Sequence, residues 1–301
     1  MIAIELIVVC LVIGVLLRLS GRLPDAAPKV LGGWVINVAL PATALGAVHG
    51  VTIDTDWLMA AATPWLGVLL AMALLIPLAR AMHWPRQRLG ALLLVAGWGN
   101  TSFVGLPMVT AYAGAQWAGL VLFIDLFGSY LALSVLGIGI ATACSTASFR
   151  WSTVFKRIIT FPPFIAIVIA LATNHLDRPE WISGLLDSLA ATLTPLALAA
   201  VGYAIRLDRI VGRLAPLAAG LGYRLAIAPL GMLGLSVAMG MTGDPVARVA
   251  IFEMAMPPML GASIIAIDHD LEPDLVALMI GIGIPLSIVT APFWWWLSGA
   301  I

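Results

Sequence analysis

Charged residues are scarce in this chain: only 10% of its 301 residues are Asp, Glu, Lys or Arg, whereas 62% are hydrophobic. A soluble domain cannot bury that much apolar surface, so this composition predicts a protein whose solvent is lipid. The formal net charge is zero, which argues against nucleic acid as a partner. Cysteine is limited to Cys10 and Cys144. We therefore expect neither a disulfide nor a cysteine-based metal site.

Long apolar runs are what the sequence has in abundance. Ten of them have roughly the length, about 20 residues, that an α-helix needs to cross the hydrocarbon core of a bilayer. The sequence therefore predicts an all-α polytopic membrane protein with ten transmembrane helices and short, charged loops. The predicted spans are 2–18, 30–48, 57–79, 89–112, 117–141, 158–174, 182–205, 214–238, 245–267 and 273–298.

Lysine and arginine are distributed unevenly among the predicted loops. The loops after spans one, three, five and seven hold most of them, and the rule that cytoplasmic loops are positive places these loops inside. Both termini are then predicted outside the cytoplasm, with the chain in a bacterial inner membrane. The loop at 268–274 is acidic but also predicted inside, because acidic residues weigh little in this rule. The basic residues used are Arg18, Arg22, Lys29, Arg80, Arg86, Arg88, Arg150, Lys156, Arg157, Arg206, Arg209 and Arg213.

The fourth span is interrupted between Gly97 and Pro107, where the sequence reads Gly-Trp-Gly-Asn-Thr-Ser-Phe-Val-Gly-Leu-Pro. Glycine loosens a helix and proline removes a backbone donor. Open backbone is tolerated at membrane depth only where it lines a protein cavity. The segment therefore predicts a broken helix that exposes polar groups near the middle of the membrane, as in secondary transporters. The alternative is a proline-kinked helix whose polar side chains only bind neighbouring helices.

The two halves of the chain have matching interruptions. Pro41 lies inside span two and Pro195 inside span seven, while span nine contains Pro257 and Pro258 where span four is broken. Five spans precede the basic loop and five follow it, so the second half must be inverted relative to the first. Interrupted spans at corresponding positions of inverted halves point to a transporter site.

Three ionisable residues lie deep inside spans: Asp125, Arg224 and Glu253. At 1.5 Å per residue each lies roughly 12–15 Å from a span edge, near the middle of an apolar layer about 30 Å thick. Asn100 falls at the same depth. Charges are costly in lipid, so these groups should face one another or a cavity.

The charges at this depth do not balance, because one arginine faces two acids. Arg224 is expected to form an ion pair with Asp125 or Glu253. On the structural alternative, this ion pair only stabilises the packing of the helices. The second acid would then carry a proton or bind Na⁺, with Ser129, one turn from Asp125, as a further ligand. An anionic substrate would meet the positive ends of the broken helices, with Asn100, Thr101 and Ser102 as donors and Arg224 as a charge.

The motif Asn100-Thr-Ser-Phe-Val-Gly-Leu-Pro107 resembles the Asn-x-x-Phe-x-Gly-x-Pro signature of the auxin efflux carrier family, the PIN-type membrane transport proteins. Ala255-Met256-Pro257-Pro258 is similar to the second-half break of that family, and Leu40-Pro41-Ala42 to its second-helix motif. The resemblance covers essentially the whole chain, with a short central loop as in bacterial members. Many members have an Asn after the second Pro-Pro, whereas this chain reads Met259-Leu-Gly-Ala-Ser263.

The resemblance implies two inverted five-helix repeats, at 1–141 and 158–301, joined by a short cytoplasmic loop at 142–157. Helices one, two, six and seven would form a scaffold, and the others a mobile core in which broken helices four and nine cross at mid-membrane. It also implies elevator-type transport of small carboxylates such as malate or malonate, and dimers are common in the family. The substrate residues it implies are Asn100, Thr101, Ser102, Gly105, Pro107, Pro257 and Pro258.

The sequence thus favours a secondary transporter of small organic anions coupled to H⁺ or Na⁺, with no other cofactor and no enzymatic activity. A bile-acid-type sodium symporter of related fold is the nearest alternative, because a Glu precedes its ninth-helix break as Glu253 does here. A membrane sensor that keeps the carrier fold without transporting is another. An intramembrane enzyme would need a nucleophile and a base at one depth, but the histidines fall near span ends or in loops.

Overall fold

The computed structural model describes residues 2–48, 54–146, 150–205 and 213–300. Within these ranges the chain is helical with short connections, and its only extended pairing is an isolated bridge between Gly99 and Pro258. Arg206 and Arg209, which the orientation prediction used, lie outside the described residues, as does His49, one of the four histidines.

The described residues of the first half form eight α-helices, interspersed with short π-helical or 3₁₀ turns. Helix α4 begins at an N-cap, where the Asp54 carboxylate accepts a hydrogen bond from the Trp57 N–H at 3.0 Å. The elements are α1 (Ile2–Leu19), α2 (Ala27–Trp34), η1 (Val35–Ala39), α3 (Leu40–Ala47), α4 (Thr55–Ala81), α5 (Arg86–Gly97), η2 (Thr101–Gly105), α6 (Leu106–Tyr112), η3 (Ala115–Trp117), α7 (Ala118–Phe123), η4 (Ile124–Tyr130), η5 (Leu133–Gly137) and α8 (Ile138–Cys144).

In the second half, the described residues form nine α-helices and one π-helical turn. Three of these helices, α10, α15 and α17, begin with proline, whose fixed φ and missing N–H suit the first helical turn. The elements are α9 (Trp151–Ile159), α10 (Pro162–Ala172), α11 (Glu180–Ala190), α12 (Leu193–Ala204), α13 (Leu214–Gly222), η6 (Tyr223–Ile227), α14 (Ala228–Ala238), α15 (Pro245–Met254), α16 (Leu260–Asp268) and α17 (Pro273–Gly299).

Six helical segments of the described chain are long and apolar enough to cross a membrane. They match predicted spans two, three, five, seven, eight and ten, and so confirm an all-helical membrane protein. Predicted spans four and nine are each divided into two shorter helices, and span six is the short α10. The six segments are Ala27–Ala47, Thr55–Ala81, Ala115–Cys144, Glu180–Ala204, Leu214–Ala238 and Pro273–Gly299.

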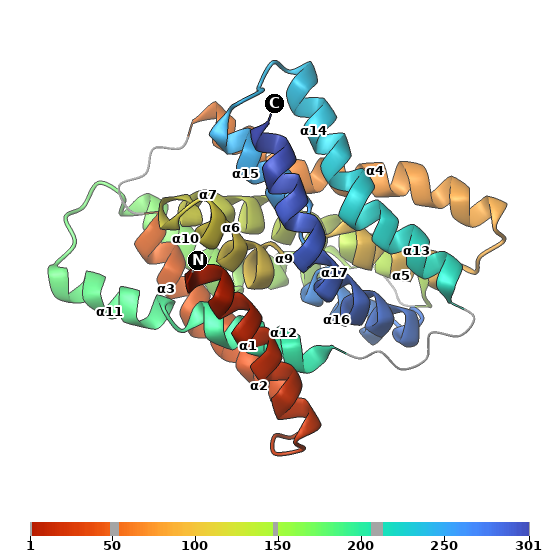
Figure 1. Ribbon diagram of the computed structural model, residues 1–301, viewed down its shortest axis with the longest axis horizontal. Coiled ribbons are helices and arrows are strands. Elements are labelled where there is room, and N and C mark those ends of the chain that lie inside the picture. The colour runs from red at the N-terminus through yellow and green to blue at the C-terminus, as the bar shows by residue number, and fades with distance from the viewer. Residues whose placement is uncertain (1, 49–53, 147–149, 206–212, 301) are drawn as a thin grey trace.

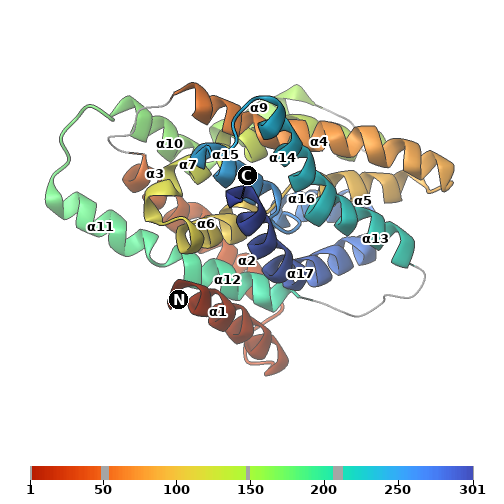
Figure 2. The same ribbon diagram turned by 45° about the horizontal axis from the view of Figure 1, so that its top comes forward.

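The helices form two groups along the long axis of the molecule (Figures 1 and 2). Helix α11 projects at one end and the ends of α4 and α13 lie at the other. In the first group α1 packs on α12, and α3 on α10 and α11. Contact between α1 and α12 is close at Gly14 and Gly202, where an added Cβ would overlap a backbone carbonyl oxygen of the other helix. Small residues allow such close packing between helices in membranes.

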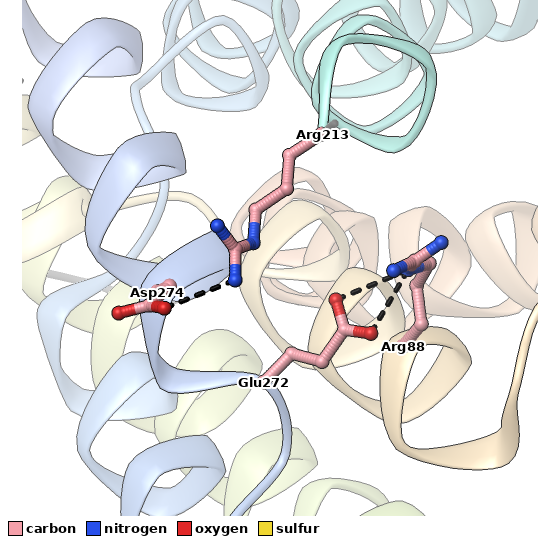
Figure 3. Close-up of polar contacts among 4 residues, drawn as sticks. All are labelled: Arg88, Arg213, Glu272 and Asp274. Carbon is pink, nitrogen blue, oxygen red and sulfur yellow. Dashed lines mark hydrogen bonds and ion pairs between the residues drawn. The ribbon is translucent and has the colours of Figure 1, made fainter. Parts of the chain in front are cut away.

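Three loops meet at one end of the second group through two ion pairs (Figure 3). Arg88, at the start of α5, binds both carboxylate oxygens of Glu272 at 2.9 and 3.1 Å. Arg213, before α13, binds Asp274 in the first turn of α17 at 3.0 Å. The acidic loop at 268–274 therefore lies beside basic residues from two loops that were predicted on its own side of the membrane.

The segment 142–157, predicted as a loop, is largely helical. It contains the end of α8 and most of α9, while residues 147–149 lie outside the described part. The predicted sixth span, 158–174, is correspondingly shorter, since α9 runs to Ile159 and α10 begins at Pro162. A helix of nine residues is too short to cross the membrane, so the predicted bounds of this connecting segment stay a prediction.

Candidate functional site

The two interrupted helices meet backbone to backbone. The Asn100 N–H donates to the Pro257 carbonyl at 2.7 Å, and the Met259 N–H donates to the Trp98 carbonyl at 3.0 Å. Gly99 and Pro258 form an antiparallel bridge between these bonds. We call this contact of residues 98–100 with residues 257–259 the crossing. Helix ends leave unpaired N–H and C=O groups, and the crossing pairs some of them. The predicted interruptions at 97–107 and 256–263 are therefore confirmed as breaks that lie against each other.

Local sequence explains where each break begins and ends. Helix α5 ends at Gly97, and Trp98 is extended with φ −111° and ψ 129°. Asn100 then caps η2, because its side-chain oxygen accepts from the Phe103 N–H at 3.1 Å. Pro107 lies in the first turn of α6, where its missing N–H costs no hydrogen bond. In the second break Pro257 and Pro258 provide no N–H, so the backbone between α15 and α16 stays extended.

Arg224, in η6, binds the carboxyl-terminal ends of both broken helices. Its guanidinium donates to the carbonyl of Met254, the last residue of α15, and to that of Gly97, the last residue of α5, at 3.3 Å. A weaker contact reaches Ala96 at 3.5 Å. These ends carry free carbonyls and the negative end of each helix dipole, which a cation stabilises. Arg224 is only 1% exposed.

The predicted ion pair of Arg224 with Asp125 or Glu253 is not present. Among the described residues no carboxylate lies within 4.0 Å of the guanidinium. The prediction considered only the two acids at the depth of Arg224. In the fold, the guanidinium instead binds free backbone carbonyls at two helix ends. A guanidinium has five donors in a planar fork, which suits several carbonyls at once.

Asp125, in η4, lies at the amino-terminal end of the first break. Its Oδ1 accepts hydrogen bonds from the hydroxyls of Thr101 and of Ser102, the latter at 2.9 Å. The Ser129 hydroxyl shares a hydrogen bond with that of Thr101 at 3.2 Å. A carboxylate is stabilised by such donors and by the positive end of the η2 turn. Asp125 is therefore brought together with Ser129, as expected for an ion site, and also with Thr101 and Ser102, which the sequence analysis assigned to the substrate.

Glu253, in the last turn of α15, has a buried carboxyl group without a protein partner. The residue is 1% exposed, and neither carboxyl oxygen has a hydrogen-bond partner. The side chain lies against Gly105, where an added Cβ would stand 2.8 Å from the carboxyl carbon. Gly105 thus makes room for this group. A buried carboxyl without donors is costly when ionised, so this position favours a bound proton or cation.

A small cavity joins these groups. Its volume of about 10 Å³ is what the centre of a single water molecule needs. Sequence reasoning missed Thr63 and Pro64, which line this cavity. A threonine directly before a proline inside an apolar span was the signal that could have pointed to them. The lining consists of Thr63, Pro64, Gly97, Gly99, Thr101, Ile124, Ser129, Arg224, Glu253 and Met254.

Two buried nitrogen donors near the crossing also lack partners. They are the amide Nδ2 of Asn100 and the Nε of Arg224. Ser263, in contrast, bonds to the Met259 carbonyl of its own helix at 2.9 Å. It therefore does not replace the asparagine that many auxin carriers have after the second Pro-Pro. The site thus offers two free donors and one free carboxyl group.

A second, larger cavity of about 230 Å³ lies between α4, α14 and α15. Its lining is almost entirely apolar and includes Met59, Met232, Met239 and Met241. Thr63 lines both cavities. It therefore separates the polar crossing from this apolar space.

Comparison with known proteins gives a family match and two full-length relatives. A family model described as "Membrane transport protein" matches residues 145–295. An uncharacterized transporter of Methanothermobacter thermautotrophicus is 25% identical over 291 residues, which cover 96% of this chain and 95% of the relative. An uncharacterized transporter of Methanocaldococcus jannaschii is 22% identical over 308 residues, covering 97% and 96%. These matches confirm the resemblance based on the Asn100–Pro107 motif.

Proposed function

Because the chain belongs to the membrane transport protein family, we propose that it is a secondary transporter of small organic anions coupled to protons. The observation that carries this proposal is the carboxyl group of Glu253, which is buried at the crossing without a hydrogen-bond partner. Broken helices that meet in this way are where secondary transporters bind substrates and ions.

The anion would bind at the amino-terminal ends of η2 and α16. Free N–H groups and the positive dipole end make such termini anion sites. The Asn100 amide adds a directed donor that has no partner in this structure. Arg224 contributes positive potential but keeps its hydrogen bonds to the two helix ends. Its role is therefore to hold the two broken helices in position and not to bind the substrate directly.

Protonation of Glu253 would couple the proton to the anion. An ionised Glu253 would repel a carboxylate at the same crossing, whereas the neutral form removes that repulsion and can donate a hydrogen bond. By linkage, a proton that strengthens anion binding is itself bound more tightly when the anion is present. Asp125 already accepts two hydrogen bonds, so it would organise the η2 end by fixing the side chains of Thr101 and Ser102.

Alternating access would require the two groups of helices to move relative to one another. In this reading α1, α2, α3, α10, α11 and α12 form the scaffold, and the remaining spans form the mobile core of an elevator. The close contact of α1 and α12 at Gly14 and Gly202 supports a rigid scaffold. A 10 Å³ cavity cannot hold an organic anion, so binding would need the crossing to open. The ten spans would then be two inverted repeats.

Orientation follows from the basic loops. The ion pairs of Arg88 with Glu272 and of Arg213 with Asp274 support one cytoplasmic face for the loops after spans three, seven and nine. Both termini would then lie outside the cytoplasm.

The proposal is tested by uptake into proteoliposomes that contain the purified protein. A panel of radiolabelled mono- and dicarboxylates is offered under an inward pH gradient, an inward Na⁺ gradient, or neither. We expect at least one carboxylate to accumulate against its gradient only when the pH gradient is imposed. Accumulation driven by Na⁺ alone would favour the sodium-symporter alternative, and no uptake of any carboxylate under any gradient would contradict the proposal.

A further inference from the structure

Helix α9 has an apolar face that is largely exposed in the described part of the chain. Trp151, Phe155 and Ile159 recur every four residues along it and are 67%, 66% and 49% exposed. On an α-helix this spacing places the three side chains on one face. Val154, beside them, is turned inward and only 2% exposed.

The side of α9 next to this apolar face is polar and basic. Ser152 and Lys156 are exposed and Arg157 is half-buried, while exposed Arg150 directly precedes the helix. No ion pair with a described residue engages Arg150, Lys156 or Arg157. Helix α9 therefore carries exposed basic residues beside an exposed apolar face.

The length of α9 excludes a transmembrane position. Nine residues extend about 14 Å, less than half of an apolar layer about 30 Å thick. A short helix with an apolar stripe, an aromatic residue and a basic face lies in the plane of the membrane interface. Its apolar side chains enter the acyl region while its cations stay at headgroup level.

We propose that α9 lies in the membrane interface and binds the headgroups of anionic phospholipids through Arg150, Lys156 and Arg157. This inference does not depend on what the protein transports. Charge complementarity selects an anionic lipid over a neutral one, because each basic residue near an anionic surface contributes to binding. Trp151 and Phe155 provide the apolar contact that a soluble anion would not need.

Helix α9 is connected to the crossing through Tyr130. The hydroxyl of Tyr130, in η4, donates to the backbone carbonyl of Arg157 at 2.7 Å. The ring of Tyr130 also stacks on Phe161 with centroids 3.9 Å apart. Tyr130 directly follows Ser129, which lines the crossing cavity. A lipid that fixes α9 therefore also restrains the π-helical turn that carries Asp125 and Ser129.

Depth measurement tests the position of α9. Single nitroxide labels are attached at Phe155→Cys or Ser152→Cys in the full chain lacking Cys10 and Cys144, in bilayers of phosphatidylglycerol and phosphatidylcholine. We expect the label at 155 to be relaxed mainly by oxygen and the matched label at 152 mainly by a water-soluble nickel chelate. Equal, water-like relaxation at both positions would overturn the proposal and point to a protein partner on this face.

Lipid selectivity tests the basic residues. Binding of phosphatidylglycerol and of phosphatidylcholine with identical acyl chains is measured by native mass spectrometry of the detergent-solubilised protein. We expect preference for phosphatidylglycerol to fall about fivefold for each charge removed in Arg150→Gln and Lys156→Gln. The control Arg80→Gln with Arg86→Gln removes two exposed basic residues elsewhere and should leave it unchanged. Equal loss in both pairs, or competition by glycerol phosphate as effective as the lipid, would contradict a lipid site at α9.

Discussion

The backbone N–H of Asn100 donates a hydrogen bond to the carbonyl of Pro257 at 2.7 Å. Residues 157 positions apart in the chain thus join two broken helices at their interruptions. Proline makes this possible, because Pro258 has no N–H to continue the helix and the Pro257 carbonyl is left without an intrahelical donor. The side chain of Asn100 meanwhile caps η2, which leaves its amide nitrogen available for a ligand.

Asn100 has two separable roles, and two substitutions distinguish them. Asn100→Ala removes both the cap and the amide donor, so we expect loss of anion binding and a decrease of about 1 kcal/mol in the free energy of unfolding. Asn100→Ser keeps a capping oxygen but lacks the amide, so it should lose anion binding at nearly unchanged stability. Thermal unfolding with and without carboxylate measures both effects. Full carboxylate-dependent stabilisation in Asn100→Ser would refute the ligand role.

Arg224 holds the carbonyl ends of α5 and α15, so its loss should damage the fold before it affects the substrate. Arg224→Met leaves several buried carbonyls unpaired, and we expect a loss of about 3 kcal/mol in unfolding free energy. Arg224→Lys keeps the charge without the planar fork and should lose less. Thermal unfolding in the absence of any carboxylate is the measurement. Wild-type stability in both variants, with only anion binding lost, would instead make Arg224 a substrate ligand.

Gly105 makes space for the carboxyl group of Glu253. Gly105→Ala should displace this flexible side chain, so we expect only a small change in stability but a clear loss of proton-driven uptake. Gly139→Ala is the matched control, because no atom lies within 4 Å of a Cβ added there, and it should transport normally. Uptake assays on both variants decide the matter. Equal, wild-type uptake would mean that Glu253 needs no defined position.

The ion pairs in Figure 3 predict which loops share a side of the membrane. Single cysteines at exposed Gln87 and Asp270, in a chain without Cys10 and Cys144, should react with an impermeant maleimide from the same side. Cysteines at exposed Gln116 and Asp177 should react only from the opposite side. Labelling of intact cells and of inverted vesicles gives the comparison. Reaction of positions 87 and 270 from different sides would contradict the packing of α5 against the start of α17.

Sequence reasoning located the two breaks and most of the groups that meet there. Thr101 is hydrogen-bonded to both Asp125 and Ser129, and Arg224 and Glu253 line the same cavity as Thr101 and Ser129. This was predictable because burying polar groups in an apolar layer is costly, so charged residues at one depth converge. The partner of Arg224 was not predictable, since free carbonyls at helix ends carry no sequence signature. Thr63 was missed for a related reason: tertiary packing alone brings α4 to the crossing.

Transport by Glu253→Gln tests the central claim most directly, because glutamine resembles the protonated carboxyl but cannot release a proton. The variant is reconstituted in proteoliposomes and compared with wild type and with Asp125→Asn for two activities: exchange of carboxylate across the membrane and accumulation driven by a pH gradient. We predict that Glu253→Gln exchanges carboxylate at all tested pH values but no longer accumulates it. Asp125→Asn should weaken both activities together. Proton-driven accumulation that persists in Glu253→Gln would contradict the account.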